Sequence, residues 1–320
     1  MIIGFQSIWP TENQLFFAED DWSSKVYGDN IFYPLLALKR YAEKKGVTLG
    51  NVNKFELEKI DAFVFHEMPK QDNSYFQHAL TTNKPMFLFN FEPKEIYYDS
   101  HVLSNHDYFV KVFTNHDQYI DGKKYIKINP FCVDARPPYK NPNKTNLCTL
   151  ISTNKWWIDG PNVLYSERLK AIEWFEQNHP ESFEFFGYDW KHEEHPCYKG
   201  VTYNKIETLS SYKFAICYEN IKDLPGYITE KIFDCFRAGC VPIYLGANNV
   251  TDYIPKQCFI DRSKFKDYSE MYTYISTMSS QRYNNYLKSI TKFIENERGK
   301  LFSVDHFVKT MWNGLMEVIG

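Results

Sequence analysis

A glutamate and a lysine stand next to each other where the sequence changes from a strand pattern to a helix pattern. The apolar run 212–218 predicts a buried parallel strand, and the polar residues Glu219 and Asn220 follow it directly. After a short loop the sequence predicts a helix whose first turn contains Glu230 and Lys231. The free backbone N–H groups and the dipole of a helix N-terminus attract anions. This arrangement therefore indicates an anion site, with a phosphate group as the expected ligand.

The two charges of this first turn differ in how easily they are explained. A carboxylate such as Glu230 is stabilised by the positive end of the helix dipole, so no ligand is needed to account for it. A cation such as Lys231 opposes the dipole, and a bound phosphate would offset that cost. The alternative for Lys231 is a hydrated surface lysine, and the helix pattern alone leaves both interpretations open.

Strand and helix patterns alternate along the whole chain. The elements of this alternation must position the helix turn that contains Glu230 and Lys231. Such alternation is typical of doubly wound parallel sheets, which bind ligands beyond the carboxyl ends of their strands. Strands are predicted at 2–8, 61–65, 85–91, 110–114, 125–128, 147–152, 183–186, 212–218 and 241–245. Helices are predicted at 31–45, 161–177, 229–238, 268–278, 280–297 and 304–318, with Pro161 in the first turn of its helix.

A stretch rich in proline, asparagine and lysine, residues 136–146, separates the two halves of the pattern. We therefore predict an α/β protein with two Rossmann-like, doubly wound domains, 1–140 and 146–300, that face each other across a cleft. The final segment, 301–320, contains an amphipathic helix that would pack back on the N-terminal domain.

The composition excludes several classes of protein. The 320 residues carry a net charge of -3 and contain no long basic run, so a nucleic-acid partner is not expected. The seven cysteines are scattered singly, as in a protein of a reducing compartment. The N-terminus lacks the pattern of a signal peptide, and no apolar run approaches the roughly 18 residues that span a bilayer. A cytoplasmic location is therefore expected.

The segment 212–255 resembles the donor-binding signature of the alpha-1,3/1,4-fucosyltransferases, glycosyltransferase family ten. That signature is an apolar strand, F-E-N, a loop, Y-V/I-T-E-K, a helix and G-x-V-P-I/V-x-x-G. The chain has Y-E-N at 218–220, Y-I-T-E-K at 227–231 and G-C-V-P-I-Y-L-G at 239–246, in the family's order and spacing. It departs from the family at Tyr218, where phenylalanine is usual, and in the sequence of the loop before the second motif.

Two weaker matches lie upstream of this segment. N-F-E-P at 90–93 resembles the family's acidic motif, usually N-F/x-E-S-P, although the serine is missing from this chain. S-E-R at 166–168, in the middle of the predicted helix 161–177, resembles the site of the family's phosphate-binding arginine.

The resemblance implies a role for each matched residue. Glu92 would be the base that takes the proton from the acceptor hydroxyl, with Glu95 and Glu67 as rivals for this role. Lys231 and Arg168 would neutralise the diphosphate of the leaving group. The remaining donor-binding residues would contact the nucleotide or line the end of the strand, with Glu230 accepting hydrogen bonds from the ribose hydroxyls: Glu219, Asn220, Tyr227, Thr229 and Glu230.

The activity that the resemblance implies is an inverting transfer of L-fucose from GDP-fucose to an N-acetylglucosamine-containing, lactosamine-like glycan, with an alpha-1,3 linkage. The architecture would be GT-B, with the acceptor bound by the N-terminal domain. No metal or other cofactor is implied, and the sequence lacks the Asp-x-Asp motif of the metal-dependent class. The expected partners are GDP-fucose and an oligosaccharide or glycoconjugate acceptor, and a glycolipid acceptor would add peripheral contact with a membrane. Without the membrane anchor of eukaryotic members, a bacterial or viral cytosolic enzyme is expected.

Other interpretations remain open at the level of sequence. A related GT-B transferase with another nucleotide sugar would share these motifs, because few residues read the sugar ring. A non-catalytic module that binds a nucleotide or a glycan would keep the fold without turnover. His192, His195 and Cys197 are close enough in sequence to hold a metal, although a loop with charged neighbours explains them better. His66 beside Glu67 could form a further catalytic pair, but a histidine at a strand end is more often only packed.

Overall fold

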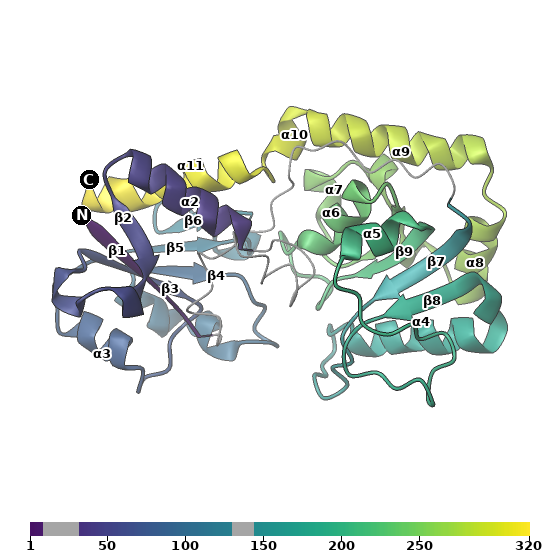
Figure 1. Ribbon diagram of the computed structural model, residues 1–320, viewed down its shortest axis with the longest axis horizontal. Coiled ribbons are helices and arrows are strands. Elements are labelled where there is room, and N and C mark those ends of the chain that lie inside the picture. The colour runs from purple at the N-terminus through teal and green to yellow at the C-terminus, as the bar shows by residue number, and fades with distance from the viewer. Residues whose placement is uncertain (9–31, 130–143) are drawn as a thin grey trace. The chain divides into compact units, whose positions relative to one another are not determined.

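The structure, a computed structural model, describes residues 1–8, 32–129 and 144–320. The chain forms two compact units (Figure 1). Unit 1 comprises Met1–Cys132 and Phe302–Gly320, and unit 2 comprises Val133–Leu301. Each unit has its own parallel sheet and its own hydrophobic core.

Unit 1 contains a six-stranded parallel sheet with the strand order β2-β1-β3-β4-β5-β6. The neighbouring strands β3 and β4 are built from the apolar runs AFVFH and MFLFN, which are buried almost throughout, as is usual in a sheet covered on both faces. Because these two strands are parallel, the residues that follow them lie at the same edge of the sheet. The strands are β1 (Ile2–Ser7), β2 (Thr48–Asn51), β3 (Ala62–His66), β4 (Met86–Asn90), β5 (Lys111–Thr114) and β6 (Tyr125–Lys127).

Helices cover both faces of this sheet. α2 and α11 share the core of one face, and α3 packs on the other. The last helix, α11, contributes the buried side chains of Phe307, Met311 and Leu315 to the core of unit 1. At Gly314 it comes so close to β5 that an added Cβ would lie 2.6 Å from the ring of Phe113. The α-helices among the described residues of unit 1 are α2 (Tyr33–Lys44), α3 (Ser74–Leu80) and α11 (Val304–Ile319).

Unit 2 contains a five-stranded parallel sheet with the strand order β11-β10-β9-β7-β8. The central strand β9 pairs with β10 on one side and with β7 on the other. The carboxyl ends of β7 and β9 therefore lie side by side, at the edge where sheets of this kind bind ligands. The strands are β7 (Asn146–Ile151), β8 (Phe183–Phe186), β9 (Tyr212–Tyr218), β10 (Val241–Leu245) and β11 (Ile260–Asp261).

The helices of unit 2 also cover both faces of its sheet. α4 and α8 join the core through Phe175 and Met271, in a cluster that also contains Phe214 of β9. α5 and α6 contact each other and β9, so the first turn of α6 lies near the end of that strand. The helices are α4 (Tyr165–Asn178), α5 (Lys205–Ser210), α6 (Glu230–Arg237), α7 (Val250–Tyr253), α8 (Tyr268–Ser276), α9 (Ser280–Glu295) and α10 (Glu297–Lys300).

The predicted α/β fold with two parallel sheets is confirmed. The predicted start of one helix was wrong: α4 begins at Tyr165, so Pro161 lies in the turn before it and Arg168 lies in its first turn. Val163 forms a β-bridge with Ile221, and the N–H of Leu164 donates to the carbonyl of Asn220. These contacts keep the stretch before Tyr165 non-helical.

The elements that the sequence did not predict are β2, β11, α3, α5, α7 and α10, which are too short to show a clear periodicity. The predicted linker 136–146 lies largely outside the described residues. None of the helices in the described part of the chain combines the length and the apolar character needed to cross a membrane.

Candidate functional site

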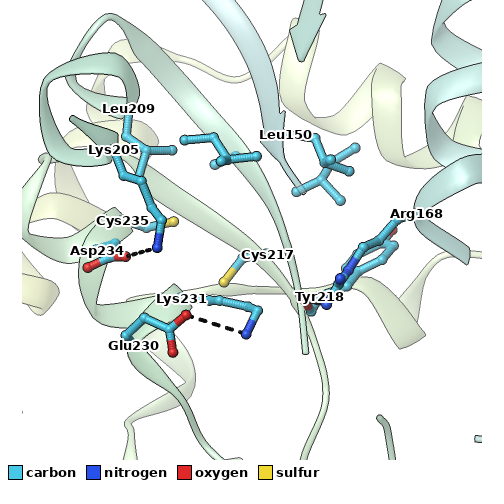
Figure 2. A pocket seen from close by; sticks show the side chains of 13 residues that line it. Leu150, Arg168, Lys205, Leu209, Cys217, Tyr218, Glu230, Lys231, Asp234 and Cys235 are labelled. Carbon is cyan, nitrogen blue, oxygen red and sulfur yellow. Dashed lines mark hydrogen bonds and ion pairs between the residues drawn. The ribbon is translucent and has the colours of Figure 1, made fainter. Parts of the chain in front are cut away.

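A pocket opens in unit 2 at the carboxyl ends of β7 and β9 (Figure 2). It encloses about 520 Å³ of space, part of which is open to solvent. The strand ends supply apolar walls such as Leu150 and Ile216, whereas helices supply the charges. The charged lining residues are Arg168 of α4, Lys205 of α5, and Glu230, Lys231 and Asp234 of α6. The pocket thus brings the charged ends of three helices to one sheet edge.

Glu219 links the end of β9 to the first turn of α6. Its carboxylate is fully buried, and its Oε1 accepts the backbone N–H of Thr229 at 2.8 Å. The Thr229 hydroxyl donates to Glu219 Oε2 at 2.6 Å and accepts a hydrogen bond from Lys231 Nζ at 3.1 Å. Lys231 Nζ also lies 3.5 Å from Glu219 Oε2. Glu219 therefore anchors this turn and balances the charge of Lys231.

The N-terminus of α6 has no side-chain cap among the described residues. Thr229 occupies the N-cap position, and its hydroxyl donates to Glu219 and makes no cap hydrogen bond. The N–H groups of a first turn have no partner within the helix. An anion at this end of α6 would meet these N–H groups and the ammonium of Lys231 together.

Glu230 and Lys231 form an ion pair with 3.6 Å between Oε1 and Nζ, and their side chains are 22% and 26% exposed. Burial acts to raise the pKa of Glu230, but the charges of Lys231 and Lys205 outweigh it and hold this pKa below its ordinary value. Burial acts to lower the pKa of Lys231, but Glu230 and Glu219 outweigh it and raise this pKa. The two carboxylates also explain why a lysine is tolerated in this turn, so its presence does not by itself require a phosphate.

Arg168 is almost fully buried and already binds the end of β9. Its Nη2 donates to the carbonyl oxygens of Tyr218 and Glu219, each at 2.7 Å, and to Asn220 Oδ1 at 3.1 Å. Its Nη1 donates to the Ser152 hydroxyl at 3.2 Å. These bonds occupy Nη2 and part of Nη1, whereas a guanidinium carries five N–H groups in all. Arg168 therefore holds the strand end in place and still has N–H groups for a ligand in the pocket that it lines.

The other predicted donor-binding residues support the pocket without lining it. Tyr227 is 2% exposed, and its hydroxyl accepts a hydrogen bond from Asn220 Nδ2 at 3.2 Å. Thr229 is buried as well. The structure thus brings all the predicted donor-binding residues together, but only three of them line the pocket: Arg168, Glu230 and Lys231.

Two charged residues of the pocket were missed by the sequence analysis. Lys205 begins α5, and its Nζ lies 3.8 Å from Oδ2 of Asp234, whose side chain is 8% exposed. The charge of Lys205 also contributes to the lowered pKa of Glu230. The sequence signal that could have identified the start of α5 is the N-cap residue Asn204, whose side chain accepts the N–H of Glu207.

Glu92, the predicted base, lies in unit 1 just after β4, with a half-buried side chain. Its backbone N–H donates to Glu67 Oε1 at 2.9 Å, and its carbonyl lies 2.7 Å from His101 Nε2. Glu67 follows β3 directly and is fully buried, so this rival base does not reach the surface. Glu95, the other rival, is partly exposed.

The loop histidines considered as metal ligands make other contacts. His195 Nδ1 lies 3.0 Å from Glu176 Oε2, and the ring of His192 packs on Tyr198. Across 1–8, 32–129 and 144–320, no group of three or more histidine, cysteine, aspartate or glutamate side chains is placed to hold a metal ion.

Two parallel-sheet α/β units, one with a charged pocket at its strand ends, are the features of the GT-B class of glycosyltransferase folds. A crystal structure of an alpha1,3-fucosyltransferase with GDP-fucose shares this fold with a TM-score of 0.57 and 17% sequence identity. The match covers 98% of this chain and 89% of that chain. The predicted GT-B architecture is therefore confirmed at the level of the fold.

Residues 156–301 match the family model described as glycosyltransferase family 10 (fucosyltransferase) C-term. The resemblance seen in the sequence is thus confirmed over this segment, which is less than half of the chain. The alpha-(1,3)-fucosyltransferase FucT of Helicobacter pylori is 41% identical over 85 residues, which are 26% of this chain and 17% of that protein. The 4-galactosyl-N-acetylglucosaminide 3-alpha-L-fucosyltransferase 9 of Bos taurus is 30% identical over 175 residues, which are 52% and 42% of the two chains. These matches span less than half the length of either relative.

Proposed function

We propose that this protein transfers L-fucose from GDP-fucose to a hydroxyl of an N-acetylglucosamine-containing glycan, with inversion and an alpha-1,3 linkage. The observation that carries the proposal is the pocket lined by Arg168, Glu230 and Lys231 within the family 10 domain. Sugar transfer needs stabilisation of the departing diphosphate and a base for the acceptor hydroxyl. Cations of the pocket supply the first, and Glu92 of unit 1 supplies the second.

The donor would be bound both by charged side chains and by backbone N–H groups. Lys231 and the uncapped start of α6 suit the diphosphate, because an ammonium and a helix N-terminus both stabilise negative charge. The remaining N–H groups of Arg168 would add directional hydrogen bonds. Glu230, whose pKa is held low by Lys231 and Lys205 against the effect of burial, is an ionised acceptor suited to the ribose hydroxyls.

The same cations lead us to propose that transfer needs no metal ion. Arg168, Lys205 and Lys231 all line the pocket, and the sequence lacks Asp-x-Asp. Transfer should therefore continue in excess chelator. A loss of more than about tenfold on chelation, restored by manganese, would show that a metal stabilises the leaving group instead.

A donor panel tests the proposed activity. Purified protein is incubated with a lactosamine acceptor and, in separate reactions, GDP-fucose, GDP-mannose and UDP-glucose, and the released nucleotide and the product linkage are measured. We expect product from GDP-fucose alone. Product from another donor would favour a related transferase. Tight binding of GDP-fucose without product across a panel of acceptors would favour a non-catalytic module.

The role of Glu92 is tested by Glu92→Gln, which keeps the shape of the side chain and removes its basicity. Transfer should fall by roughly 10² to 10⁴, the usual contribution of a general base. GDP-fucose affinity should stay near normal, because the pocket residues belong to unit 2. The pH profile of kcat/KM should also lose its acidic limb. Near-normal transfer by Glu92→Gln together with a loss in Glu95→Gln would assign the role to Glu95.

A further inference from the structure

Side chains from elsewhere in unit 1 hold the backbone of Glu92 on both sides. Its N–H donates to Glu67 Oε1 at 2.9 Å, and the N–H of Phe91 donates to the same oxygen at 2.8 Å. The carbonyl of Glu92 lies 2.7 Å from His101 Nε2, and the carbonyl of Phe91 lies 3.2 Å from His116 Nε2. The two residues that follow the end of β4 are thus fixed at both their N–H and their C=O groups.

Position 67 is unfavourable for a glutamate in two ways, through the burial of the side chain and through the backbone conformation. It is fully buried, and its backbone φ of 62° lies in the left-handed region that few non-glycine residues adopt. Its own N–H donates to the carbonyl of Phe89 at 2.9 Å, which extends the pairing of β3 with β4 past the strand end. Burying a carboxyl group costs free energy unless hydrogen bonds compensate it. The two N–H groups of Phe91 and Glu92 provide that compensation at Oε1, whereas Oε2 is buried without a hydrogen-bond partner among the described residues.

The hydrogen bonds of His101 define which ring nitrogen carries the proton. Burial lowers the pKa of His101, so the ring is neutral near pH 7. Because Nε2 contacts a carbonyl oxygen, Nε2 must donate, and Nδ1 then accepts from the Tyr119 hydroxyl at 3.1 Å. The ring of His116 stacks on His101 with 4.9 Å between the centroids. The His101 ring therefore holds the Glu92 carbonyl in a fixed direction.

The pairing of His66 with Glu67 that the sequence suggested is not formed. His66 Nδ1 contacts the Ser7 hydroxyl at 3.1 Å, whereas the Glu67 carboxyl binds the backbone beyond β4. Burial lowers the pKa of His66 to about 4, so this ring is neutral as well. Glu67 is left with a backbone-binding role.

We propose that Glu67 and His101 are positioning residues that hold the main chain of Glu92 and so orient its carboxylate toward the acceptor hydroxyl. The inference rests on the proposed role of Glu92 as the base. A base contributes fully only when it is held in hydrogen-bonding geometry, and a misplacement of about 1 Å costs on the order of 10²-fold in rate. Loss of the hydrogen bonds from either Glu67 or His101 should therefore lower kcat and leave donor binding unchanged.

Two substitutions at Glu67 separate the hydrogen bonds from the filling of space. Glu67→Gln keeps an oxygen that accepts both N–H groups, and Glu67→Met fills a similar volume without an acceptor. We expect kcat of Glu67→Met to fall by about 10- to 100-fold, with the KM for GDP-fucose unchanged, and Glu67→Gln to restore most of the loss. The exposed residue Glu58 gives the control Glu58→Gln, which should behave like the wild type.

Glu92→Gln is measured in parallel, so that failure of the inference is distinguished from failure of the proposed base. If Glu92→Gln loses transfer while Glu67→Met keeps the wild-type kcat, Glu67 is not a positioning residue and the base assignment stands. If Glu92→Gln transfers normally, the base assignment itself fails. A Glu67→Gln variant as impaired as Glu67→Met, or a parallel loss of GDP-fucose affinity, would also overturn the inference.

His101 provides an independent test if Glu67→Met does not fold. His101→Phe removes the donor to the Glu92 carbonyl and keeps a ring, and His101→Gln keeps an N–H donor. We expect kcat of His101→Phe to fall by about tenfold or more at unchanged KM for GDP-fucose, with His101→Gln closer to the wild type. Equal kcat values for His101→Phe and the wild type would remove His101 from the positioning role.

Discussion

At the scale of single residues, the proposed reaction assigns to Lys231 the most direct stabilisation of the leaving GDP. Its ammonium lines the pocket and is kept charged by Glu230 and Glu219. Loss of a charge-assisted hydrogen bond in a desolvated site costs roughly 2–4 kcal/mol, so Lys231→Ala should lower kcat/KM by about 30- to 1,000-fold with every acceptor. Steady-state assays with two acceptors measure this effect.

The control for this experiment is Lys170→Ala, because Lys170 is an exposed lysine of α4 that pairs with Glu167. It should leave kcat/KM unchanged. Since Lys231 also balances the buried Glu219, thermal unfolding of Lys231→Ala should be followed and the assays run well below its Tm. Wild-type kcat/KM in Lys231→Ala would place the diphosphate site elsewhere.

Glu67 makes the stability of the protein depend on pH. Burial raises its pKa from 4.5 to about 8, so between these values the folded chain holds a proton that the unfolded chain has lost. Its favourable contribution is therefore complete below about pH 4.5 and is lost as the pH rises toward about 8. The free energy of unfolding of Glu67→Gln, relative to the wild type, should increase between about pH 5 and pH 8.

Urea denaturation of both proteins across this range measures the difference. The pKa values of His66 and His116 are lowered by burial to about 4 and about 3, but both histidines titrate in the two proteins alike and cancel in the comparison. A difference between the two proteins that is the same at every pH would contradict the assigned titration of Glu67.

At the scale of elements, the end of β10 meets the end of β9 at Gly246. A Cβ at this position would lie 2.4 Å from the Tyr244 hydroxyl oxygen and 2.5 Å from Cγ of Glu219. Gly246→Ala should therefore destabilise the protein by roughly 1–3 kcal/mol. Because Glu219 anchors the first turn of α6, GDP-fucose affinity should fall as well, which isothermal titration calorimetry would show.

Gly50 offers the matched substitution in unit 1. A Cβ there would approach only the ring of Phe55, at 3.1 Å, which can give way more easily than two converging groups. Gly50→Ala should leave GDP-fucose affinity unchanged. An equal loss of affinity in both variants would mean that the effect comes from general destabilisation and not from displacement of Glu219.

At the scale of the whole molecule, the chain completes unit 1 with its last residues. α11 places the fully buried Leu315 in the core that also contains α2 and β4. Leu315→Ala should lower the free energy of unfolding by about 2–5 kcal/mol, because it removes buried methyl groups and leaves a cavity. Denaturation followed by the fluorescence of Trp312, which packs against the same core, measures this loss.

Val318→Ala is the control for this prediction, because Val318 lies on the same helix but is 39% exposed. Its effect should stay within about 0.5 kcal/mol. GDP-fucose binding by folded Leu315→Ala should be retained, since the pocket residues belong to unit 2. A shift for Leu315→Ala no larger than that for Val318→Ala would show that α11 adds little to the core.

The sequence by itself determined the fold class and the resemblance to the family 10 fucosyltransferases. Apolar runs such as 212–218 and 85–91 identify buried parallel strands, because every residue of such a strand meets a covered face. The motif at 227–231 places a lysine and a glutamate at a helix start, and those two residues do line the pocket. These properties are local, since they depend on residues that are close in sequence.

Tertiary structure alone decided which groups the charged side chains bind. Arg168 binds the carbonyl of Glu219, 51 residues away, and Glu67 binds the N–H of Glu92, 25 residues away. The starting point of α4 was mispredicted for the same reason, because the partner that holds the preceding segment lies on another element. Burial and hydrogen bonding depend on distances through space, which hydrophobic periodicity does not encode. The sequence therefore pointed to three of the five charged residues that line the pocket. Only the packing of the strand ends against the helices added Lys205 and Asp234 and separated the residues that line the pocket from those that support it.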